Sequence, residues 1–234
     1  MKFIVFIPAR SGSKSILNKN LSIINGKTLI VRSAEVALKS SRVDKVVFSS
    51  DSKKYINLIE DYNKDIIIHH RSKNLSSDTA KIEDCVNSFV DETALKLNGG
   101  DVIILIEPTS PFIEVEHINS LIELYCANDN ISSAQTIVKF SATNNPDSRL
   151  SLDPKFNKLT RIIDHKHKEE KAKYYRFGNL CSAKIKFIKS GKKFLESGGD
   201  AVLVPKKYGI NIDSQLELEI AQIIAQDFES LSNE

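Results

Sequence analysis

Short apolar runs alternate with amphipathic stretches along most of the chain, and this alternation predicts the elements of the fold. The runs at 3–7, 45–50 and 101–106 are continuous enough for buried strands. Shorter runs predict further strands at about 66–68, 131–138 and 201–205. Apolar residues at helical spacing predict helices at about 29–40, 52–62, 79–97, 115–128 and 214–229. Strand, loop and helix repeated in this order are typical of an α/β fold, in which helices cover both faces of a mostly parallel sheet.

Two parts of the chain need a separate interpretation. The last predicted helix should pack through one apolar face, which consists of Leu216, Ile220, Ile223, Ile224 and Phe228. Between about 140 and 178 the alternation stops, and turn residues are followed by a dense run of charge. Because this segment is too long for an ordinary connection, we expect an excursion that serves as a lid or a dimer contact. We predict a single domain over 1–234 that contains this excursion.

Composition and charge narrow the class of protein. The 33 cationic side chains are interleaved with 30 anionic ones, and the resulting net charge of +3 argues against a nucleic-acid partner. No apolar run approaches the roughly 20 residues of a membrane span, and the run at 3–7 is too short for a signal peptide. Cys85, Cys126 and Cys181 are far apart, form no zinc motif and fit a reducing compartment. We therefore expect a cytoplasmic globular protein that has neither a nucleic acid nor a membrane as a partner.

Polar loops follow the strands of the predicted sheet. In parallel sheets ligands bind outside the carboxyl ends of the strands, so the loops at 9–20, 50–52 and 107–111 should share one cleft. The first loop places three cations, Arg10, Lys14 and Lys19, around a small-residue stretch at 11–13. It matches neither standard phosphate-binding fingerprint. From the residues alone it is either a cationic cradle for a phosphate chain or an exposed basic turn.

Several motifs resemble those of one enzyme family. The stretch IPARSGSKSILNKNL at 7–21 resembles the opening motif IPARxGSKxIxxKN of the acylneuraminate cytidylyltransferases (CMP-sialic acid synthetases). Further segments resemble the other motifs of that family in the same order: FSSD at 48–51, Arg71 with SDT at 77–79, PTSP at 108–111, and IDS at 212–214 with EL at 217–218. Together these segments extend over nearly the whole chain, which makes chance agreement a poor explanation.

The resemblance implies a Rossmann-like fold of the nucleotide-diphospho-sugar transferase type and a homodimer. It also implies Mg²⁺-dependent transfer of CMP from CTP to a nine-carbon α-keto acid sugar, such as sialic acid or a legionaminic- or pseudaminic-type relative. The implied catalytic residues are Lys19, Arg10 and Asp213, and Lys19 would stabilise charge at the reacting phosphate. The residues implied to bind CTP are Ala9, Arg10, Ser11, Gly12, Ser13, Lys14, Asn20, Arg71, Ser77, Asp78 and Thr79.

The sugar and metal positions depart from the family pattern. The family places two aspartates in D-x-D, and here Asn211 precedes Asp213, so the implied Mg²⁺ site keeps an oxygen but loses a charge. The family's glutamine before P-T-S-P is Glu107, which would repel an acid sugar's carboxylate but welcome an amino or hydroxyl substituent. The family's R-x-N-G becomes RFGN at 176–179, with the asparagine and glycine exchanged. The implied sugar-binding residues are Glu107, Lys168, Arg176 and Asn179, of which Arg176 or Lys168 would hold the sugar carboxylate.

Two alternatives remain open at this stage. The acceptor could be an eight-carbon 3-deoxy-octulosonate or its amino derivative, although the S-K-x(4)-K-N spacing of the opening loop argues against that sugar. The chain could also be a nucleotide-binding protein whose catalysis has decayed, as Asn211 would suggest. Lys19 and Asp213 are in place, which argues against decay.

Overall fold

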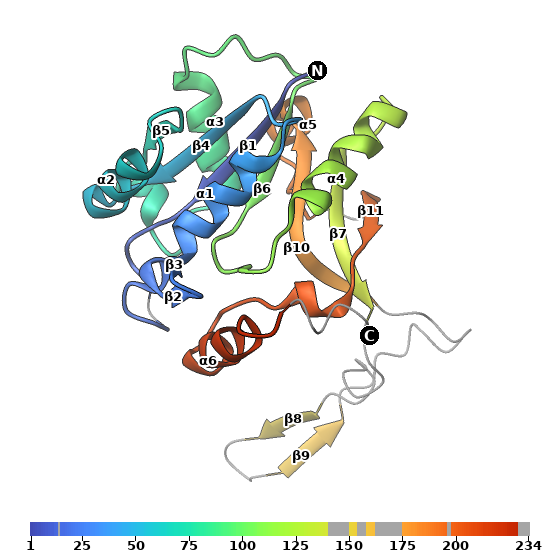
Figure 1. Cartoon of the computed structure of the whole chain (residues 1–234). Helices are drawn as coiled ribbons and strands as arrows, with labels where there is room; N and C mark the ends of the chain where they lie inside the picture. The colour runs from blue at the N-terminus through green and yellow to red at the C-terminus, as the bar shows by residue number, and fades with distance from the viewer. Residues whose placement is uncertain (14, 140–149, 154–157, 162–174, 196–197, 229–234) are drawn as a thin grey trace, which may run out of the picture.

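The computed structural model describes residues 1–13, 15–139, 150–153, 158–161, 175–195 and 198–228. A seven-stranded sheet runs through its centre (Figure 1). In spatial order the strands are β11 (Asp200–Leu203), β7 (Ser133–Lys139), β10 (Tyr175–Lys184), β6 (Val102–Ile106), β1 (Phe3–Pro8), β4 (Lys45–Ser50) and β5 (Ile67–His70). β10 is antiparallel to β6 and β7, and all other neighbouring strands in this sheet are parallel. The predicted α/β class with a mostly parallel sheet is confirmed.

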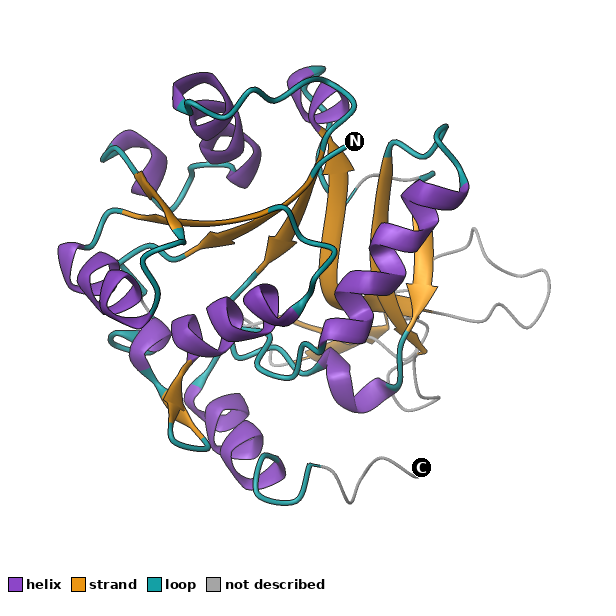
Figure 2. Cartoon of the chain, turned by 45° about the horizontal axis from the view of Figure 1, so that its top comes forward, coloured by secondary structure: helices purple, strands orange, loops and turns teal. Residues whose placement is uncertain are grey.

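Helices lie on both sides of the sheet (Figure 2). They are α1 (Leu29–Lys39), α2 (Lys53–Tyr62), α3 (Ile82–Glu92), α4 (Val115–Ala127), α5 (Ile185–Lys189) and α6 (Gln215–Ile224). Successive side chains of β1 point to opposite faces of the sheet and so belong to two parts of the core. Val5 and Ile7 pack with α1, α2 and α4, whereas Ile4 and Phe6 pack with α3 and α5. All four side chains are fully buried. A strand that is apolar at every position is what a sheet covered on both faces requires.

Shorter elements complete the fold. β2 (Ile23–Ile24) and β3 (Lys27–Thr28) pair through a two-residue turn at Asn25 and Gly26, both of which have positive φ. Asn-Gly is the sequence that such a turn favours. β8 (Leu150–Asp153) and β9 (Lys158–Arg161) pair only with each other, in a separate two-stranded sheet. The rest of the expected excursion at 140–178 lies outside the described residues, apart from the first residues of β10.

Three sequence predictions about elements need correction. The helix expected at 79–97 is α3, which covers only Ile82–Glu92. Small polar side chains bond to the backbone on both flanks of the helix: ahead of it Ser77 Oγ donates to Asn74 O at 3.1 Å, and at its end Thr93 Oγ1 accepts from the Leu95 N–H at 3.2 Å. Such local bonds compete with helix formation.

The other two corrections concern β10 and α6. β10 was not predicted, although it lies between β6 and β7 in the centre of the sheet. α6 ends before the predicted 229, and three members of its expected inner face are exposed, namely Leu216, Ile220 and Ile223. The side chains that α6 buries are Leu218 and Ala221, which pack against Ile24, Leu29 and Ile212 with Ile224 and Phe228 beside them. Within the described part of the chain, no helix has the length and apolar character needed to cross a membrane.

Candidate active site

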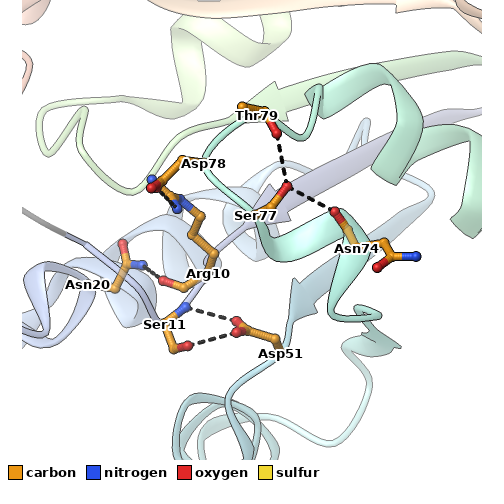
Figure 3. A network of polar contacts seen from close by, with 8 residues as sticks. All are labelled: Arg10, Ser11, Asn20, Asp51, Asn74, Ser77, Asp78 and Thr79. Carbon is orange, nitrogen blue, oxygen red and sulfur yellow. Dashed lines mark hydrogen bonds and ion pairs between the residues drawn. The ribbon is translucent and has the colours of Figure 1, made fainter.

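The opening loop begins where β1 ends, and its first residues are tied to the end of β4 (Figure 3). The Ser11 N–H donates to Asp51 Oδ1 at 2.8 Å, and the Ser11 hydroxyl donates to Asp51 Oδ2 at 2.7 Å. One residue before Asp51, Ser50 Oγ donates to Ala9 O at 2.6 Å. Because the parallel strands β1 and β4 end at the same edge of the sheet, these bonds hold the loop over that edge. Ala9, Ser11 and Asp51 anchor the loop and do not line the cavity beside it.

An ion pair holds the loop against the segment at 77–79, and each of the two has a further hydrogen bond of its own. The Arg10 guanidinium points at the Asp78 carboxylate, with 2.5 Å between Nη1 and Oδ1 (Figure 3). Asn20 is buried and donates through Nδ2 to Arg10 O at 3.1 Å. The hydroxyls of Ser77 and Thr79 lie 3.4 Å apart. The ion pair therefore joins two segments that are 68 residues apart in sequence.

A cavity of about 300 Å³ opens beside these contacts. Its wall comes from four parts of the chain: the opening loop, the region 71–85, the loop after β6 and the segment before α6. The sequence-predicted residues on the wall are Arg10, Ser13, Lys19, Asn20, Arg71, Ser77, Asp78, Glu107, Asn211 and Asp213. The loops after β1 and β6 therefore share one cleft, as expected. The expected loop at 50–52 does not line the cavity and is connected to the opening loop through the bonds to Ala9 and Ser11.

Arg71 is the most buried cation of this wall. It lies after β5, its side chain packs inward, and burial lowers its pKa. Its Nε donates to Ser49 Oγ at 3.3 Å, and Ser49 Oγ lies 2.9 Å from His69 Nδ1. Its Nη2 is buried and has no hydrogen-bond partner among the described residues. A buried guanidinium N–H without a partner at the wall of a cavity is a ready donor for a ligand oxygen.

Lys19 lines the same cavity, near acidic side chains. Its Nζ donates to Ile212 O at 2.9 Å and lies 3.9 Å from Asp213 Oδ1. Glu107 is within electrostatic reach of both the Lys19 ammonium and the Asp213 carboxylate. Burial raises the pKa of its carboxyl, the charge of Asp213 raises it further, and Lys19 acts in the opposite direction. Asn211 donates through Nδ2 to Asp213 Oδ2 at 2.9 Å, whereas its Oδ1 is buried without a partner.

Asn179, which was expected to bind the sugar, does not line the cavity. Its side chain is fully buried; Oδ1 accepts from Thr136 Oγ1 at 2.9 Å, and Nδ2 lies 3.0 Å from His117 Nδ1. Gly178 beside it has no room for a side chain, because a Cβ would lie 2.7 Å from Thr136 Oγ1. The exchanged order of glycine and asparagine thus fits the packing of an irregular stretch of β10 against β7.

The other sequence-predicted residues have different positions. Gly12 and Thr79 are exposed and do not line the cavity. Lys14 and Lys168 lie outside the described residues. Arg176 belongs to β10, where it is paired with Val138, but its side chain is not described.

Sequence reasoning missed part of the apolar wall. Leu75, Ala80, Ile82 and Cys85 line the cavity, and Ile82 and Cys85 lie one turn apart on α3. This i, i+3 spacing was available in the sequence, but nothing in it distinguished a cavity wall from a core face. Cys85 donates from Sγ to Leu75 O at 3.4 Å, and burial raises the pKa of its thiol.

The arrangement suits a polyanionic ligand that has a polar aromatic or sugar part. Arg10 and Lys19 present positive charge to the cavity, and Arg71 adds a buried donor. Asp213 lies 3.9 Å from Lys19, and the Glu107 carboxylate lines the same cavity within electrostatic reach of both. Cationic donors for phosphates and acidic oxygens for a hard cation are the groups that a nucleotidyl-transfer site needs.

Comparison with known proteins agrees with this chemistry. N-acylneuraminate cytidylyltransferase of Escherichia coli O18:K1:H7 is 27% identical over 228 residues, which cover 96% of this chain and 52% of that protein. CMP-N,N'-diacetyllegionaminic acid synthase of Legionella pneumophila is 33% identical over 129 residues, 53% of each protein. The chain thus spans about half the length of these relatives. A solved structure of CMP:2-keto-3-deoxy-manno-octonic acid synthetase complexed with CTP shares the fold, with a TM-score of 0.72 and 18% identity over 97% of this chain and 100% of that one.

The decisive comparison is with a family model. The model described as Cytidylyltransferase matches residues 4–198, which include the opening loop, Arg71 and Glu107 and so most of the cavity wall. The match covers well over half of the chain. The chain belongs to the cytidylyltransferase family.

Proposed function

We propose that this protein transfers CMP from CTP to the anomeric hydroxyl of a nine-carbon α-keto acid sugar and releases pyrophosphate. The observation that carries the proposal is the convergence of Arg10, Lys19 and Arg71 with Glu107 and Asp213 on one cavity at the carboxyl edge of the sheet. Family membership supports CTP as the nucleotide. The names of the E. coli and Legionella relatives support a nonulosonate as the acceptor.

The nucleoside of CTP would bind at the Arg71 end. The buried Arg71 Nη2 has no partner of its own, so an oxygen of the base or ribose would satisfy it. Asn20 and Ser77 line the same wall and add amide and hydroxyl groups. Arg71 has little freedom to move, because its guanidinium is held through Ser49.

The phosphates would extend from there toward Lys19. Arg10 would bind them on one side, once its contact with Asp78 gives way to phosphate oxygens. Lys19 is half-buried and held by Ile212 O, which supports a role in which its ammonium would bind the reacting phosphate with little rearrangement. The sugar hydroxyl would lose its proton to solvent as its oxygen bonds to the α-phosphorus and the bond to pyrophosphate breaks. Catalysis would consist mainly of positioning and charge neutralisation.

Mg²⁺ fits the donor set near Lys19. Asp213 offers an exposed carboxylate, and Asn211 offers a buried Oδ1 that has no partner among the described residues. When bound, the ion would neutralise phosphate charge and assist pyrophosphate as a leaving group. We also propose that the protein is a homodimer and that the 140–178 excursion supplies a dimer contact or a lid, with Arg176 or Lys168 binding the sugar carboxylate.

A coupled pyrophosphate assay tests the proposal. CTP and Mg²⁺ are incubated with a panel of nonulosonates and octulosonates, and pyrophosphate release is followed. We expect release that depends on CTP and on a nonulosonate. Lys19→Ala should lower kcat by about 10²–10³-fold, the range for removal of a group that stabilises transition-state charge. Lys27→Ala is the matched control, because Lys27 lies on β3, does not line the cavity and pairs with Glu35.

The panel also distinguishes the alternatives. Release with octulosonates alone would move the assignment to the eight-carbon sugars. Absence of release with every acid sugar, despite CTP binding, would support a decayed enzyme and contradict the proposal.

A further inference from the structure

Glu107 carries a largely buried carboxyl group that its neighbours among the described residues do not neutralise or hydrogen-bond. It is the first residue after β6, its carboxyl group is largely buried, and it lines the cavity. Among the described residues, none donates a hydrogen bond to this carboxylate or forms an ion pair with it. Charged groups away from water are normally paired with an opposite charge or bound to a metal ion. Glu107 therefore lacks a partner that a ligand would supply.

The local backbone brings Glu107 to the segment before α6. Ile212 N–H donates to Thr109 O at 2.8 Å, which joins the loop after β6 to residues 211–213. Lys19 Nζ donates to the same segment, at 2.9 Å from Ile212 O. The Lys19 ammonium attracts the carboxylates of Glu107 and Asp213, and these two carboxylates repel each other. The two carboxylates and the Lys19 ammonium together carry a net charge of −1, which favours binding of a cation.

Asn211, two residues before Asp213, also lines the cavity and offers a third oxygen. Asn211 uses its Nδ2 to hold Asp213 Oδ2 at 2.9 Å, and its Oδ1 is buried without a hydrogen-bond partner. Two carboxylates and one amide oxygen are the hard ligands that Mg²⁺ prefers. The described residues contain no group of three or more His, Cys, Asp or Glu side chains that could hold a metal alone. This agrees with an ion that is completed by nucleotide phosphates, as Mg²⁺ usually is.

We infer that Glu107 is a metal ligand, and that with Asp213 and the Asn211 amide oxygen it holds the divalent cation of the CTP complex. The inference rests on the proposed function, since CTP would complete the coordination. It also gives one explanation for both Asn211 and Glu107, two positions at which the sequence departs from the family pattern. A carboxylate at 107 replaces the carboxylate that is absent at 211, so the site keeps two negative charges. Glu107 is then a residue of the metal site and does not contact the sugar.

Calorimetric titration of CTP, with no sugar present, tests this inference. For each variant, the affinity for CTP is measured once with saturating Mg²⁺ and once with EDTA, and the ratio of the two is compared. Glu107→Gln should weaken CTP binding in Mg²⁺, yet strengthen it in EDTA because one charge that repels the phosphates is gone. The ratio should fall about tenfold or more, the range found when support for a metal site is removed. A folding defect would weaken both titrations and could not produce this opposite pair of changes.

A compensating variant and a control sharpen the test. Glu107→Gln combined with Asn211→Asp moves the charge back to 211 and should restore most of the ratio. Glu116→Gln, an exposed carboxylate on α4, should leave the ratio as it is. An unchanged ratio in Glu107→Gln would overturn the inference while leaving CTP binding intact. No CTP binding by the native protein in either condition would overturn the proposed function and this inference with it.

Discussion

At the scale of single residues, the bonds around Arg71 have a definite direction. Arg71 Nε can only donate, so Ser49 Oγ accepts from it at 3.3 Å. The described residues give the Ser49 hydroxyl one other neighbour, His69 Nδ1 at 2.9 Å, and we assign the Ser49 proton to that bond. His69 then carries its proton on Nε2, 3.5 Å from Ser88 Oγ. Burial lowers the pKa of His69, which agrees with a neutral ring. These residues hold a guanidinium whose Nη2 is left for a ligand.

This arrangement predicts that Ser49→Ala weakens CTP binding. The substitution removes the acceptor of Arg71 Nε and frees the side chain to reorient, so we expect about a fivefold rise in the Kd of CTP, the equivalent of one hydrogen bond. Calorimetric titration with CTP measures the change. Ser88→Ala is the matched control, because it removes a hydroxyl on the far side of His69 and keeps the Arg71–Ser49 bond. Equal weakening in both variants, or none in either, would contradict a positioning role for Ser49.

At the scale of elements, the strands that build the site could be predicted because their pattern depends only on burial. β1, β4 and β6 are covered on both faces, so they read as continuous apolar runs whose ends locate the loops. The cation-rich opening loop and the Glu107 loop followed directly from those ends. Prediction of Arg71 and Asp213 required the family resemblance, because no local pattern places them beside a loop that precedes them by about 50 residues or more.

β10 could not be predicted, for a physical reason that its residues show. It contains Gly178 and Asn179, which are poor strand formers, and it follows a long charged stretch. Their place in the sheet depends on Thr136 and His117, whose contacts with Asn179 are distant in sequence. Sequence separation also explains why Asn179 was expected at the sugar site. Nothing near Asn179 in the sequence shows that its amide forms hydrogen bonds inside the core.

α6 was assigned the wrong face for a related reason. Its sequence offers two apolar stripes, and the buried one is centred on Leu218 and Ala221, where the small alanine contributes little apolar weight. We therefore predict that Leu218→Ala lowers the free energy of unfolding by about 2–4 kcal/mol, as for other buried leucines. Ile223→Ala, at 68% exposure, should change it by less than about 0.5 kcal/mol. Urea denaturation measures both, and a large loss for Ile223→Ala would show that this face of α6 is covered in solution.

At the scale of the whole molecule, a buried polar cluster joins helix α4 to the neighbouring strands β7 and β10. His117 on α4 contacts Asn179 on β10, which in turn bonds to Thr136 on β7. The Tyr208 ring lies edge-on against His117, with 4.5 Å between ring centres. His117 Nδ1 also accepts from the Glu114 N–H at 3.2 Å, as part of the cap of α4. An unprotonated Nδ1 that receives these contacts requires a neutral imidazole.

The cluster makes stability depend on pH in a specific way. Burial lowers the pKa of His117 from 6.5 to about 4, with Glu116 acting weakly in the opposite direction. The unfolded chain takes up a proton near pH 6.5 while the folded chain does not, so stability is retained above that pH and is lost as the pH falls toward 4. The loss from this one group should be about 3 kcal/mol, at about 1.4 kcal/mol per pKa unit.

His117→Gln isolates this contribution. The glutamine amide oxygen can accept from both Glu114 N–H and Asn179 Nδ2, and it does not titrate. The contact with Tyr208 is lost, so we expect the variant to be about 1 kcal/mol less stable at neutral pH. Its free energy of unfolding should then fall less steeply than that of the native protein as the pH decreases from about 6.5 to 4, because the unfolded variant takes up one proton fewer. Urea denaturation across this range measures both slopes, and parallel slopes would show that His117 is protonated in the folded protein and that the cluster tolerates the charge.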